Sequence, residues 1–547
     1  MKITTSWLKP PTKATGLDHL GTQAPCVKIY GQLLPGITNV TDRARYYSFY
    51  PWVVWSYDQR FSKDDFDHFV DMFRRADCLF TLISERHSRL AADAVEHGIA
   101  MAGRNNLLPA LDRLTLGEVL KLSDYATQDE TDTRRYFKSK LGGFSQYYAG
   151  TLLELGIMQP SSRSWSYYTK QNGEHLATSI ESAAPAELFW AAVEKNEVSL
   201  SDLDALSAFC VCSIESNVSE CQHLRGIFFD TENKYAEDGI QRRRSLGLIQ
   251  QLVNALPEGF DISQDVFRAC TYSEALPAGK EWVVPESLQL TRKLWAVYVR
   301  NDLLSVAFLT VLAISLREMQ PQSAQQNPLF KTIEQFSSWF AASSAVASVT
   351  DALGSVVFGE LVSQTRQQGV SLTAWEDAEH ETQLGRALLE GWKRGDDSAL
   401  LLNICLKLLI TLAARGTSDK PYDGLAMSAE ELRDYPINLI SFHHRVELWK
   451  ELKLPEVVTD LINWSLNTHL RVALRKLRQS SRATFQLRPS ERGLEVIADQ
   501  IPDPTPTSPR FKQAIQILRD LGVLVLDRSG QTRLSEDGKK LMEGACV

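Results

Sequence analysis

The sequence predicts a mainly α-helical, multidomain protein, in which a helical body carries two small modules made of a helix, a β-hairpin and a second helix. Apolar residues recur at intervals of three and four over most of the chain, and alternating runs are few. A chain of 547 residues is also too long for one hydrophobic core. An internal similarity indicates the modules, because Leu155-Gly156 and Leu521-Gly522 are each followed by a polar turn, a strand-like segment and a helix-opening glycine.

Five consecutive segments are expected along the chain. In order, they are an N-terminal helical domain (1–125), a first module (126–182), a helical body (183–450), a basic helix (451–484) and a second module (485–547). The N-terminal domain shows helical periods at 64–75 and 84–102. In the body, apolar periodicity predicts helices at 185–194, 203–212, 242–256, 291–318, 329–341, 375–394 and 398–415.

Neither a secretory signal nor a membrane span is indicated. The N-terminal segment has no apolar core of the kind that a signal peptide needs. The two most apolar stretches, 303–316 and 399–414, are shorter than the roughly 20 residues that cross a bilayer, so we expect buried core helices. The eight cysteines form no disulfide-rich pattern. These features predict a cytoplasmic protein without membrane contact.

Charge is distributed unevenly along the chain, whose formal net charge is −8. Residues 469–547 hold 14 Lys and Arg against 9 Asp and Glu, whereas the remainder holds 45 against 58. A basic end on an acidic body is typical of a polyanion-binding segment carried by a larger interaction body. Chance asymmetry is the alternative.

The second module contains local signals that agree with one another. Ser508 stands at an N-cap position, and Pro509 stands at the first position of a helix over 510–521. Apolar residues share one face of this helix, and Gly522 ends it. The opposite face is expected to expose Arg510, Lys512, Gln513, Gln516 and Arg519 to solvent. A hairpin follows, with strands at 523–527 and 532–534.

This order of elements, over about residues 485–545, resembles the winged-helix domains of bacterial transcription regulators. The resemblance implies that 510–521 is a recognition helix, which enters the major groove of DNA. It also implies that Arg528 and Arg533 flank a wing that follows the phosphates. Winged helices also dock proteins, so protein binding remains open as the alternative.

The helix ahead of this module carries a row of basic residues. Spacings of four, three and four place four arginines on one helix face, namely Arg471, Arg475, Arg478 and Arg482. Lys476 lies beside them. Guanidinium groups in such a row suit phosphate oxygens. No acid occurs between His469 and Pro489, so the alternative, a salt-bridged face, needs acids from elsewhere. We therefore expect contact with nucleic acid, as double-stranded DNA.

The first module offers a second site for DNA or for a partner protein. Its helix at 145–155 is expected to expose Gln146, Tyr147 and Thr151, and its wing carries Arg163 and Trp165. This module is less clearly basic than the second, so protein binding is favoured over nucleic acid.

A segment rich in arginine and aromatic residues occurs near the N-terminus and reads Asp42-Arg43-Ala44-Arg45-Tyr46-Tyr47. In a helix, each arginine meets an aromatic residue four positions later, which is a geometry for cation–π contact. One interpretation is a stacking or phosphate site. The other, which we favour, is a helix packed by aromatic residues, with its arginines paired to acids.

The same segment resembles a bacterial family of unknown function, which carries Pro-Gly followed by Thr-Arg-Ala-Arg-Tyr-Phe and whose genes lie in defence loci beside helicases or nucleases. Pro35 and Gly36 precede the motif here, Asp42 stands at the family's Thr, and Tyr47 at its Phe. The resemblance implies an accessory subunit in anti-phage defence of the Druantia type. It brings no catalytic residue.

Motifs of catalytic chemistry are absent from the sequence. It contains no phosphate-binding loop, dinucleotide-binding glycine pattern, zinc-protease helix or serine nucleophile elbow, so we expect no enzyme. Cys210 and Cys212, with Cys221 and His223 downstream, are of the types that bind zinc. Because the first pair continues the apolar helix at 203–212, where a spacing of two points the thiols apart, we predict buried structural cysteines and no metal or cofactor.

Together these features predict a non-catalytic DNA-binding or DNA-sensing accessory subunit, which works beside a helicase or a nuclease. The alternative is a protein–protein scaffold in which both winged helices dock partner subunits.

Overall fold

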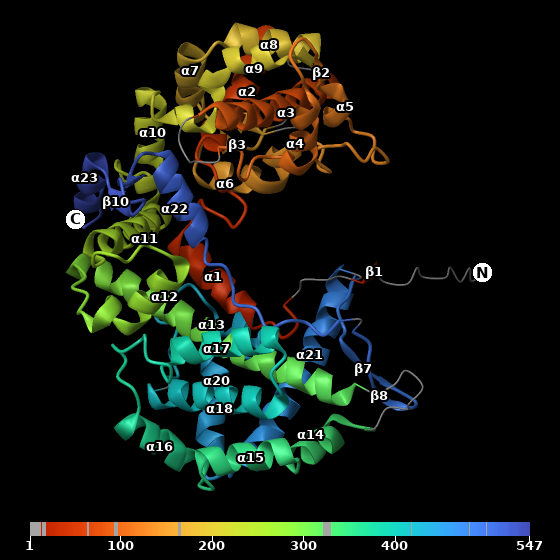
Figure 1. The fold of residues 1–547 in the computed structure, drawn as a ribbon, viewed down its shortest axis with the longest axis vertical. Helices are drawn as coiled ribbons and strands as arrows, with labels where there is room; N and C mark the ends of the chain where they lie inside the picture. Colours follow the sequence, from red (N-terminus) through yellow and green to blue (C-terminus); the bar gives the residue numbers. More distant parts are fainter. Residues whose placement is uncertain are drawn as a thin grey trace. The chain divides into compact units, whose positions relative to one another are not determined.

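The computed structural model of the chain describes residues 12–13, 18–62, 65–91, 97–161, 166–320, 330–416, 418–480, 482–498 and 500–546. Within these ranges the chain forms 23 α-helices and ten strands of two to four residues (Figure 1). The strands described there pair only in twos, so the core is made by packed helices. The predicted mainly α fold class is therefore confirmed.

Two compact units make up the chain, and neither is a continuous stretch of sequence. Unit 1 contains residues 1–32, 265–283 and 292–509, and unit 2 contains residues 33–264, 284–291 and 510–547. The five consecutive segments expected from the sequence do not coincide with these units. The C-terminal residues complete the unit that the N-terminal half builds, because the contacts that define a core join residues far apart in sequence.

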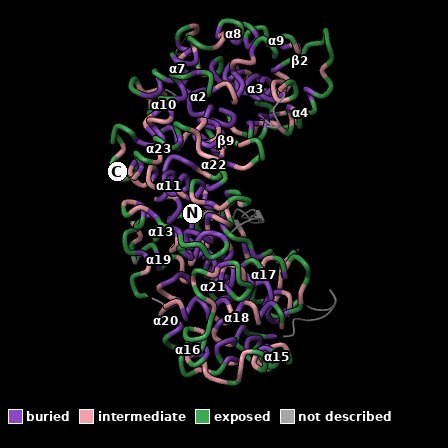
Figure 2. Tube along the Cα trace, turned by 60° about the vertical axis from the view of Figure 1, so that its left-hand side comes forward, coloured by how far each residue is buried: buried purple, intermediate pink, exposed green. Residues whose placement is uncertain are grey.

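The aromatic helix α2 (Tyr46–Arg60) lies in the core of unit 2. Tyr46, Tyr47, Tyr50, Trp52 and Tyr57 are all fully buried, and almost the whole helix is buried in Figure 2. A helix that is apolar around its circumference must be covered on every side. Here α3 (Phe66–Leu90) and α7 (Gly173–Ala183) pack against it.

The other elements in the first half of unit 2 are short, apart from two longer helices. They are α4 (Arg104–Arg113), β2 (Leu120–Lys121), α5 (Ser123–Ala126), α8 (Ala186–Lys195), β5 (Glu197–Val198), α9 (Leu200–Ala205), α10 (Val218–Phe229) and α11 (Ala236–Ala255). β2 and β5 pair antiparallel. α11 packs against the C-terminal helix α23 (Glu536–Ala545) so closely that a Cβ on Gly247 would lie 2.6 Å from the Cβ of Ala545.

Both predicted modules contain a helix, a hairpin and a second helix, and these elements belong to unit 2, whereas residues 485–509 of the predicted second module belong to unit 1. In the first, a π-helical turn (Phe144–Tyr148) and α6 (Ala149–Glu154) precede the antiparallel pair β3 (Met158–Gln159) and β4 (Tyr167–Tyr168), and α7 follows. In the second, α22 (Phe511–Asp520) precedes the antiparallel pair β9 (Leu524–Leu526) and β10 (Thr532–Leu534), and α23 follows.

Equivalent contacts close the turn after the first helix of each module. Gly156 and Gly522 have φ values of 59° and 61°, in the left-handed region that a C-capping glycine adopts. The hydroxyl groups of Thr169 and Ser535 then donate to the carbonyl oxygens of these glycines, each at 2.7 Å.

A glycine also stands in the first turn of the second helix of each module, and its lack of a side chain is required. A Cβ on Gly173 would lie 2.3 Å from the carbonyl oxygen of Ile157, and a Cβ on Gly538 would lie 2.3 Å from that of Val523. The internal similarity of the sequence therefore reflects one local structure made twice.

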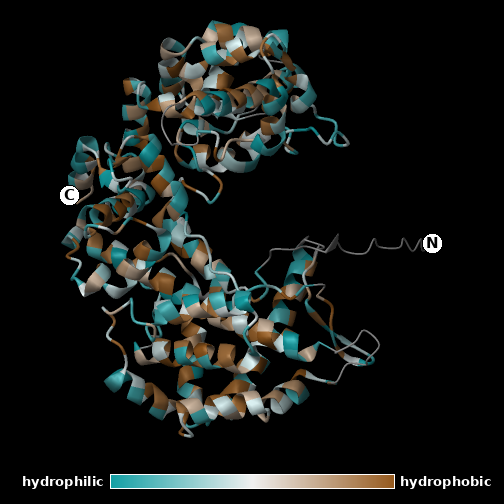
Figure 3. Cartoon of the chain, viewed as in Figure 1, coloured by the Kyte–Doolittle hydropathy of each residue, from teal (hydrophilic) through white to brown (hydrophobic). Residues whose placement is uncertain are grey.

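Two apolar helices contribute much of the core of unit 1. By length and composition, α13 (Glu286–Met319) is suited to cross a membrane, but 94% of its most apolar 18-residue window is buried inside the structure. The hydrophobic helix α18 (Ser398–Ala414), seen in Figure 3, is buried along most of its length. The expectation of buried core helices at 303–316 and 399–414 is confirmed.

The remaining elements belong wholly or almost wholly to unit 1. They are β1 (Thr12–Lys13), α1 (Gln23–Leu33), α12 (Gln264–Ser273), α14 (Ile333–Ala341), α15 (Ser344–Leu353), α16 (Phe358–Gln368), α17 (Glu381–Arg394), α19 (Ala429–Arg433), α20 (Leu439–Trp449), α21 (Leu454–Ser480), β6 (Arg482–Ala483), β7 (Leu487–Ser490) and β8 (Gly493–Val496). β1 and β6 pair in parallel, and β7 and β8 form an antiparallel hairpin.

Candidate nucleic-acid interface

The predicted row of arginines is shorter than expected. α21 ends at Ser480, and Arg482 lies in β6, which pairs with β1. The expectation that Arg482 continues the helix face is wrong, because the chain has already turned into extended pairing. Arg471, Arg475 and Arg478 remain on one face of α21.

Two of these three arginines bind the end of another helix. Arg471 Nη2 donates to the carbonyl oxygen of Arg433 at 3.2 Å, and Arg475 Nη1 donates to that of Asp434. Both carbonyls lie at the C-terminus of α19, where backbone oxygens lack a partner within their own helix. Arg475 also lies 3.6 Å from the Asp434 carboxylate, and over the ring of Tyr435. Arg475 is therefore neutralised by an acid from elsewhere in the fold, whereas Arg471 makes no ion pair with a described residue.

Lys476 stabilises the fold of unit 1 and does not face solvent beside the row as predicted. Its ammonium group donates to the carbonyl oxygen of Asp18, and burial lowers its pKa below the usual range, an effect that the Asp18 carboxylate opposes. Arg478, in contrast, is exposed and has no hydrogen bond or ion pair with any described residue. Arg471 is exposed as well. Seven residues separate them, so two uncompensated charges share one helix face.

A second basic element follows α21. The β7–β8 hairpin exposes Arg488 and Arg492, of which Arg488 pairs with Glu495 at 3.0 Å. Neither arginine belongs to the set predicted from the sequence. The absence of acids over 461–490, a stretch that reaches from α21 into the hairpin, indicates Arg488, whereas Arg492 follows Glu491 outside this stretch.

The predicted recognition helix, α22, is buried on the face that was expected to meet DNA. Gln513 is 7% exposed, and its amide donates to the carbonyl oxygen of Asn39 at 3.2 Å and to the Asp42 carboxylate at 2.9 Å. Arg510, just before the helix, donates to the carbonyl oxygen of Leu34 at 2.8 Å. A chain segment of the same unit therefore occupies the polar face of α22.

Of the five polar side chains expected in solvent on this helix, Lys512 alone is exposed. Gln516 donates to the Asp520 carboxylate at 2.8 Å, and Arg519 donates to a hydroxyl group of the hairpin at 2.9 Å. The expectation of a solvent-facing helix is wrong because the polar face finds polar partners within unit 2, a pairing that helical periodicity does not report.

The hairpin of the second module keeps one of its two predicted cations in solvent. Arg528 is exposed at the tip, whereas Arg533 is half-buried and pairs with Asp527 at 3.2 Å. The same hairpin exposes two apolar side chains, Val525 at 40% and Leu526 at 50%.

In the first module, only part of the helix expected at 145–155 has the predicted solvent exposure. Gln146 is exposed and Tyr147 is half-buried, but Thr151 is 2% exposed and its hydroxyl donates to a backbone carbonyl of the same helix. Arg163 and Trp165, predicted on the wing, lie outside the described residues.

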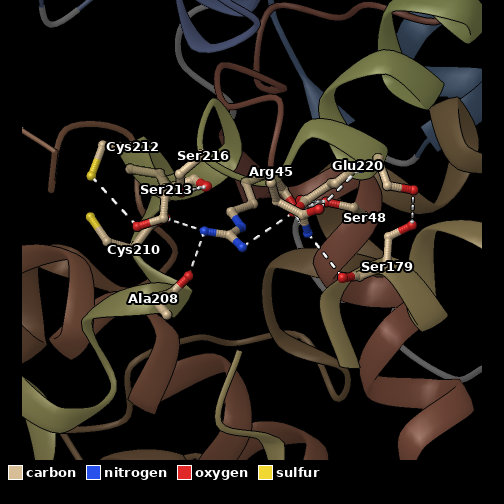
Figure 4. A network of polar contacts seen from close by, with 12 residues as sticks. Arg45, Ser48, Ser179, Ala208, Cys210, Cys212, Ser213, Ser216 and Glu220 are labelled. Carbon is tan, nitrogen blue, oxygen red and sulfur yellow. Dashed lines mark hydrogen bonds and ion pairs between the residues drawn. The ribbon is translucent and has the colours of Figure 1, made fainter. Parts of the chain in front are cut away.

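Arg43 and Arg45 are buried, with 3% and 1% of their surfaces exposed. Arg43 pairs with Asp520 at 3.0 Å, and Arg45 pairs with Glu220 at 3.2 Å (Figure 4 shows Arg45). The predicted cation–π contacts with the aromatic residues four positions later are not found in the described part of the chain. The favoured interpretation, an aromatic-packed segment whose arginines pair with acids, is confirmed, and a solvent-accessible phosphate site at these residues is not.

The helix expected at 203–212 is interrupted. α9 ends at Ala205, and Cys210 takes extended backbone angles (φ −54°, ψ 146°) between two short 3-10 turns, Ser207–Phe209 and Val211–Ile214. The expectation that the two thiols point apart is therefore wrong, and Figure 4 shows the sulfur atoms of Cys210 and Cys212 on the same side of the turn. Cys221 does not join them, since its thiol donates to the carbonyl oxygen of Leu521.

Comparison with known proteins adds no functional information. No family model, no curated protein and no solved structure matches the chain.

Proposed function

We propose that the chain is a non-catalytic accessory subunit that binds nucleic acid, with double-stranded DNA as the expected form, through exposed arginines of unit 1. Arg471 and Arg478 on α21 and Arg492 on the following hairpin supply the charge, together with Arg488 of the same hairpin, which shares its charge with Glu495. The observation that carries the proposal is that residues 461–490 contain no acid and that Arg471, Arg478 and Arg488 of this stretch are exposed. Guanidinium groups suit phosphate oxygens, and phosphate contacts dominate affinity for DNA.

The second module is not proposed to be the part of the chain that reads DNA bases, although the sequence predicts that role for it. The polar face of α22 is occupied within unit 2, so we do not propose that Arg510, Gln513 or Gln516 reads bases. Both modules are proposed to be winged helices whose first helix serves packing. Lys512 and Arg528 remain exposed, and their substitution is the control for substitution of the arginines of α21.

The accessory role rests on the resemblance of the segment at 42–47 to a defence-locus family. We propose that the chain works in the bacterial cytoplasm beside a helicase or a nuclease, which would supply the chemistry. The absence of catalytic motifs from the sequence is consistent with this division of labour.

A protein–protein scaffold is the second candidate, and one observation favours it. Val525 and Leu526 are exposed next to Arg528 on the hairpin of the second module. Apolar side chains beside an arginine are typical of a protein interface.

Fluorescence anisotropy with a labelled duplex of about 30 base pairs, in salt from about 50 to 200 mM, tests the DNA proposal. Four phosphate contacts give a slope of about −3.6 in a plot of log affinity against log salt, which is roughly a 10²-fold loss over this range. The double variant Arg471→Gln/Arg478→Gln is expected to reduce the slope by about 2. The control Lys512→Gln/Arg528→Gln removes the same charge from unit 2 and is expected to leave the slope unchanged.

Two outcomes contradict the proposal. If the control pair reduces the slope and the α21 pair does not, the contact surface lies in the second module. If the wild-type chain shows no salt-dependent binding of duplex or single strand, the scaffold is the better hypothesis.

A further inference from the structure

Four side chains of unit 2 form a cluster that the proposed function does not use. His87, His97, Cys210 and Cys212 each place one nitrogen or sulfur atom so that the four atoms lie within 4.8 Å of one another. His87 stands in the last turn of α3, Cys210 lies between the two 3-10 turns, and Cys212 lies in the second of them. Two imidazoles and two thiols form a ligand set that is typical of structural zinc.

Three of the six separations among these atoms match the edges of a tetrahedron around one zinc ion, and the other three are no longer than 4.8 Å. The Nδ1 atoms of His87 and His97 are 3.2 Å apart, Cys210 Sγ is 3.5 Å from His97 Nδ1, and Cys212 Sγ is 3.4 Å from His87 Nδ1. With Zn–N of about 2.05 Å and Zn–S of about 2.3 Å, the tetrahedral edges are about 3.3 Å between nitrogens and about 3.6 Å between nitrogen and sulfur. All three separations fall within about 0.2 Å of these edges.

We propose that His87, His97, Cys210 and Cys212 bind one zinc ion in a closed, structural site. Four protein ligands leave no position for water or substrate, so the ion stabilises the fold and takes no part in a reaction. It ties the end of α3 to a turn that lies 125 residues later in the chain. Nitrogen and sulfur donors in this geometry select zinc over magnesium and calcium, which prefer oxygen.

The surroundings of the cluster favour metal binding. His97 and Cys210 are buried, and His87 and Cys212 are half-buried, so the site is shielded from bulk water.

Arg43 and Arg45 hold the backbone of the two buried ligands. Arg43 Nη1 donates to the carbonyl oxygen of His97 at 3.4 Å, and Arg45 Nη1 donates to that of Cys210 at 2.5 Å (Figure 4). The bond from Arg45 also keeps Cys210 in the extended conformation that turns both thiols to one side. These arginines are positioning residues for the site, because supports of this kind orient metal ligands.

Elemental analysis of the full chain, purified under reducing conditions without chelator, tests the proposal. We expect one zinc ion per chain in the wild type, and less than about one tenth of that in His87→Ala and in Cys212→Ser. The matched controls are His444→Ala and Cys546→Ser, which remove the same residue types outside the cluster and are expected to keep the full metal content.

Cobalt titration of chelator-treated wild type keeps the test decisive where a variant fails to fold. The expected result is a thiolate-to-cobalt absorption band with tetrahedral d–d bands, saturating at one equivalent and abolished by zinc. A wild-type chain that is purified without metal and shows no cobalt band overturns the proposal. So does a folded Cys212→Ser or His87→Ala variant that keeps one zinc ion per chain.

Discussion

The buried ion pair between Arg43 and Asp520 joins the second module to the N-terminal part of unit 2, and its removal is expected to loosen α22. Asp520 accepts from Arg43 Nε at 3.1 Å and from the backbone N–H of Ala44 at 2.9 Å, and it lies 3.0 Å from Arg43 Nη2. The two side chains are 3% and 4% exposed. Removing one partner of such a pair leaves an uncompensated buried charge, which costs about 3–5 kcal/mol.

Hydrogen–deuterium exchange of α22 measures this cost as the free energy of opening in unit 2. For Asp520→Ala, 3–5 kcal/mol corresponds to exchange that is faster by about 10² to 10⁴-fold. The control is Asp537→Ala. Asp537 pairs with Arg225 at 2.7 Å but is 52% exposed, so its loss is expected to cost at most about 1 kcal/mol, or roughly fivefold in exchange.

The double variant Arg43→Met/Asp520→Leu separates the cost of an unpaired charge from the cost of lost packing. Replacing both charges by apolar side chains removes the unpaired ion, so it is expected to recover most of the stability that Asp520→Ala loses. The reasoning is refuted if Asp520→Ala accelerates exchange no more than Asp537→Ala does. It is also refuted if the double variant exchanges faster than the single one.

Two further predictions concern a buried histidine and a close helix contact. His469 donates from Nδ1 to the His19 carbonyl and accepts at Nε2 from the backbone N–H of Gln486, and burial lowers its pKa to about 4. In the unfolded chain this histidine has an ordinary pKa of about 6.5, so as the pH falls the unfolded chain binds the proton before the folded chain does. The free energy of unfolding of unit 1 therefore decreases by about 1.4 kcal/mol per pH unit between pH 6.5 and pH 4, and this group has no effect above pH 6.5. When the free energy of unfolding of His469→Gln is measured by urea denaturation at several pH values, we expect it to change less with pH than that of the wild type. An equal change with pH in both proteins contradicts this assignment. Gly247→Ala places a Cβ against Ala545 at 2.6 Å, so exchange of α23 should report a loss of about 1–3 kcal/mol. Gly150→Ala in α6, which meets nothing within 4 Å, should be neutral or stabilising by up to about 1 kcal/mol, and equal effects of the two changes would contradict the contact.

Local features of the fold were predictable because they depend on residues close in sequence. Apolar periodicity places α11, α13, α14 and α18 near their observed positions, and the Leu-Gly repeat identifies both modules. A Cβ on Gly173 or on Gly538 would meet backbone atoms of the same module, so the requirement for these two glycines depends on residues close in sequence.

The candidate sites were less predictable because they depend on contacts between distant residues. Asp520 lies 477 residues from Arg43, and Cys212 lies 125 residues from His87. The break at Cys210 is not indicated by its neighbours, which continue an apolar pattern. It is stabilised by Arg45, whose guanidinium binds the carbonyl oxygens of Ala208 and Cys210.

The polar faces of α21 and α22 show why solvent exposure could not be predicted from helical periodicity. α21 and α22 both present polar residues opposite an apolar face, and the sequence predicts solvent for both. Their surroundings differ, since segment 34–42 supplies carbonyl and carboxylate acceptors to α22, whereas Arg478 on α21 has no described partner. Polarity therefore predicts that a partner is needed, and only the fold decides whether that partner is water, nucleic acid or the same chain.

The Arg43–Ala44–Arg45 segment shows most clearly that charged side chains can find their partners within the same chain. Arg43 binds Asp520 of the second module and the carbonyl oxygen of His97, while Arg45 binds Glu220 and the carbonyl oxygen of Cys210. Guanidinium groups with several donors in a fixed plane can join carboxylates and carbonyls at one buried point, which lysine cannot do with the same geometry. An Arg-x-Arg pattern of this kind therefore indicates a shared core architecture rather than a shared nucleic-acid contact. For that reason, we look for nucleic-acid binding on the exposed arginines of α21 and its hairpin.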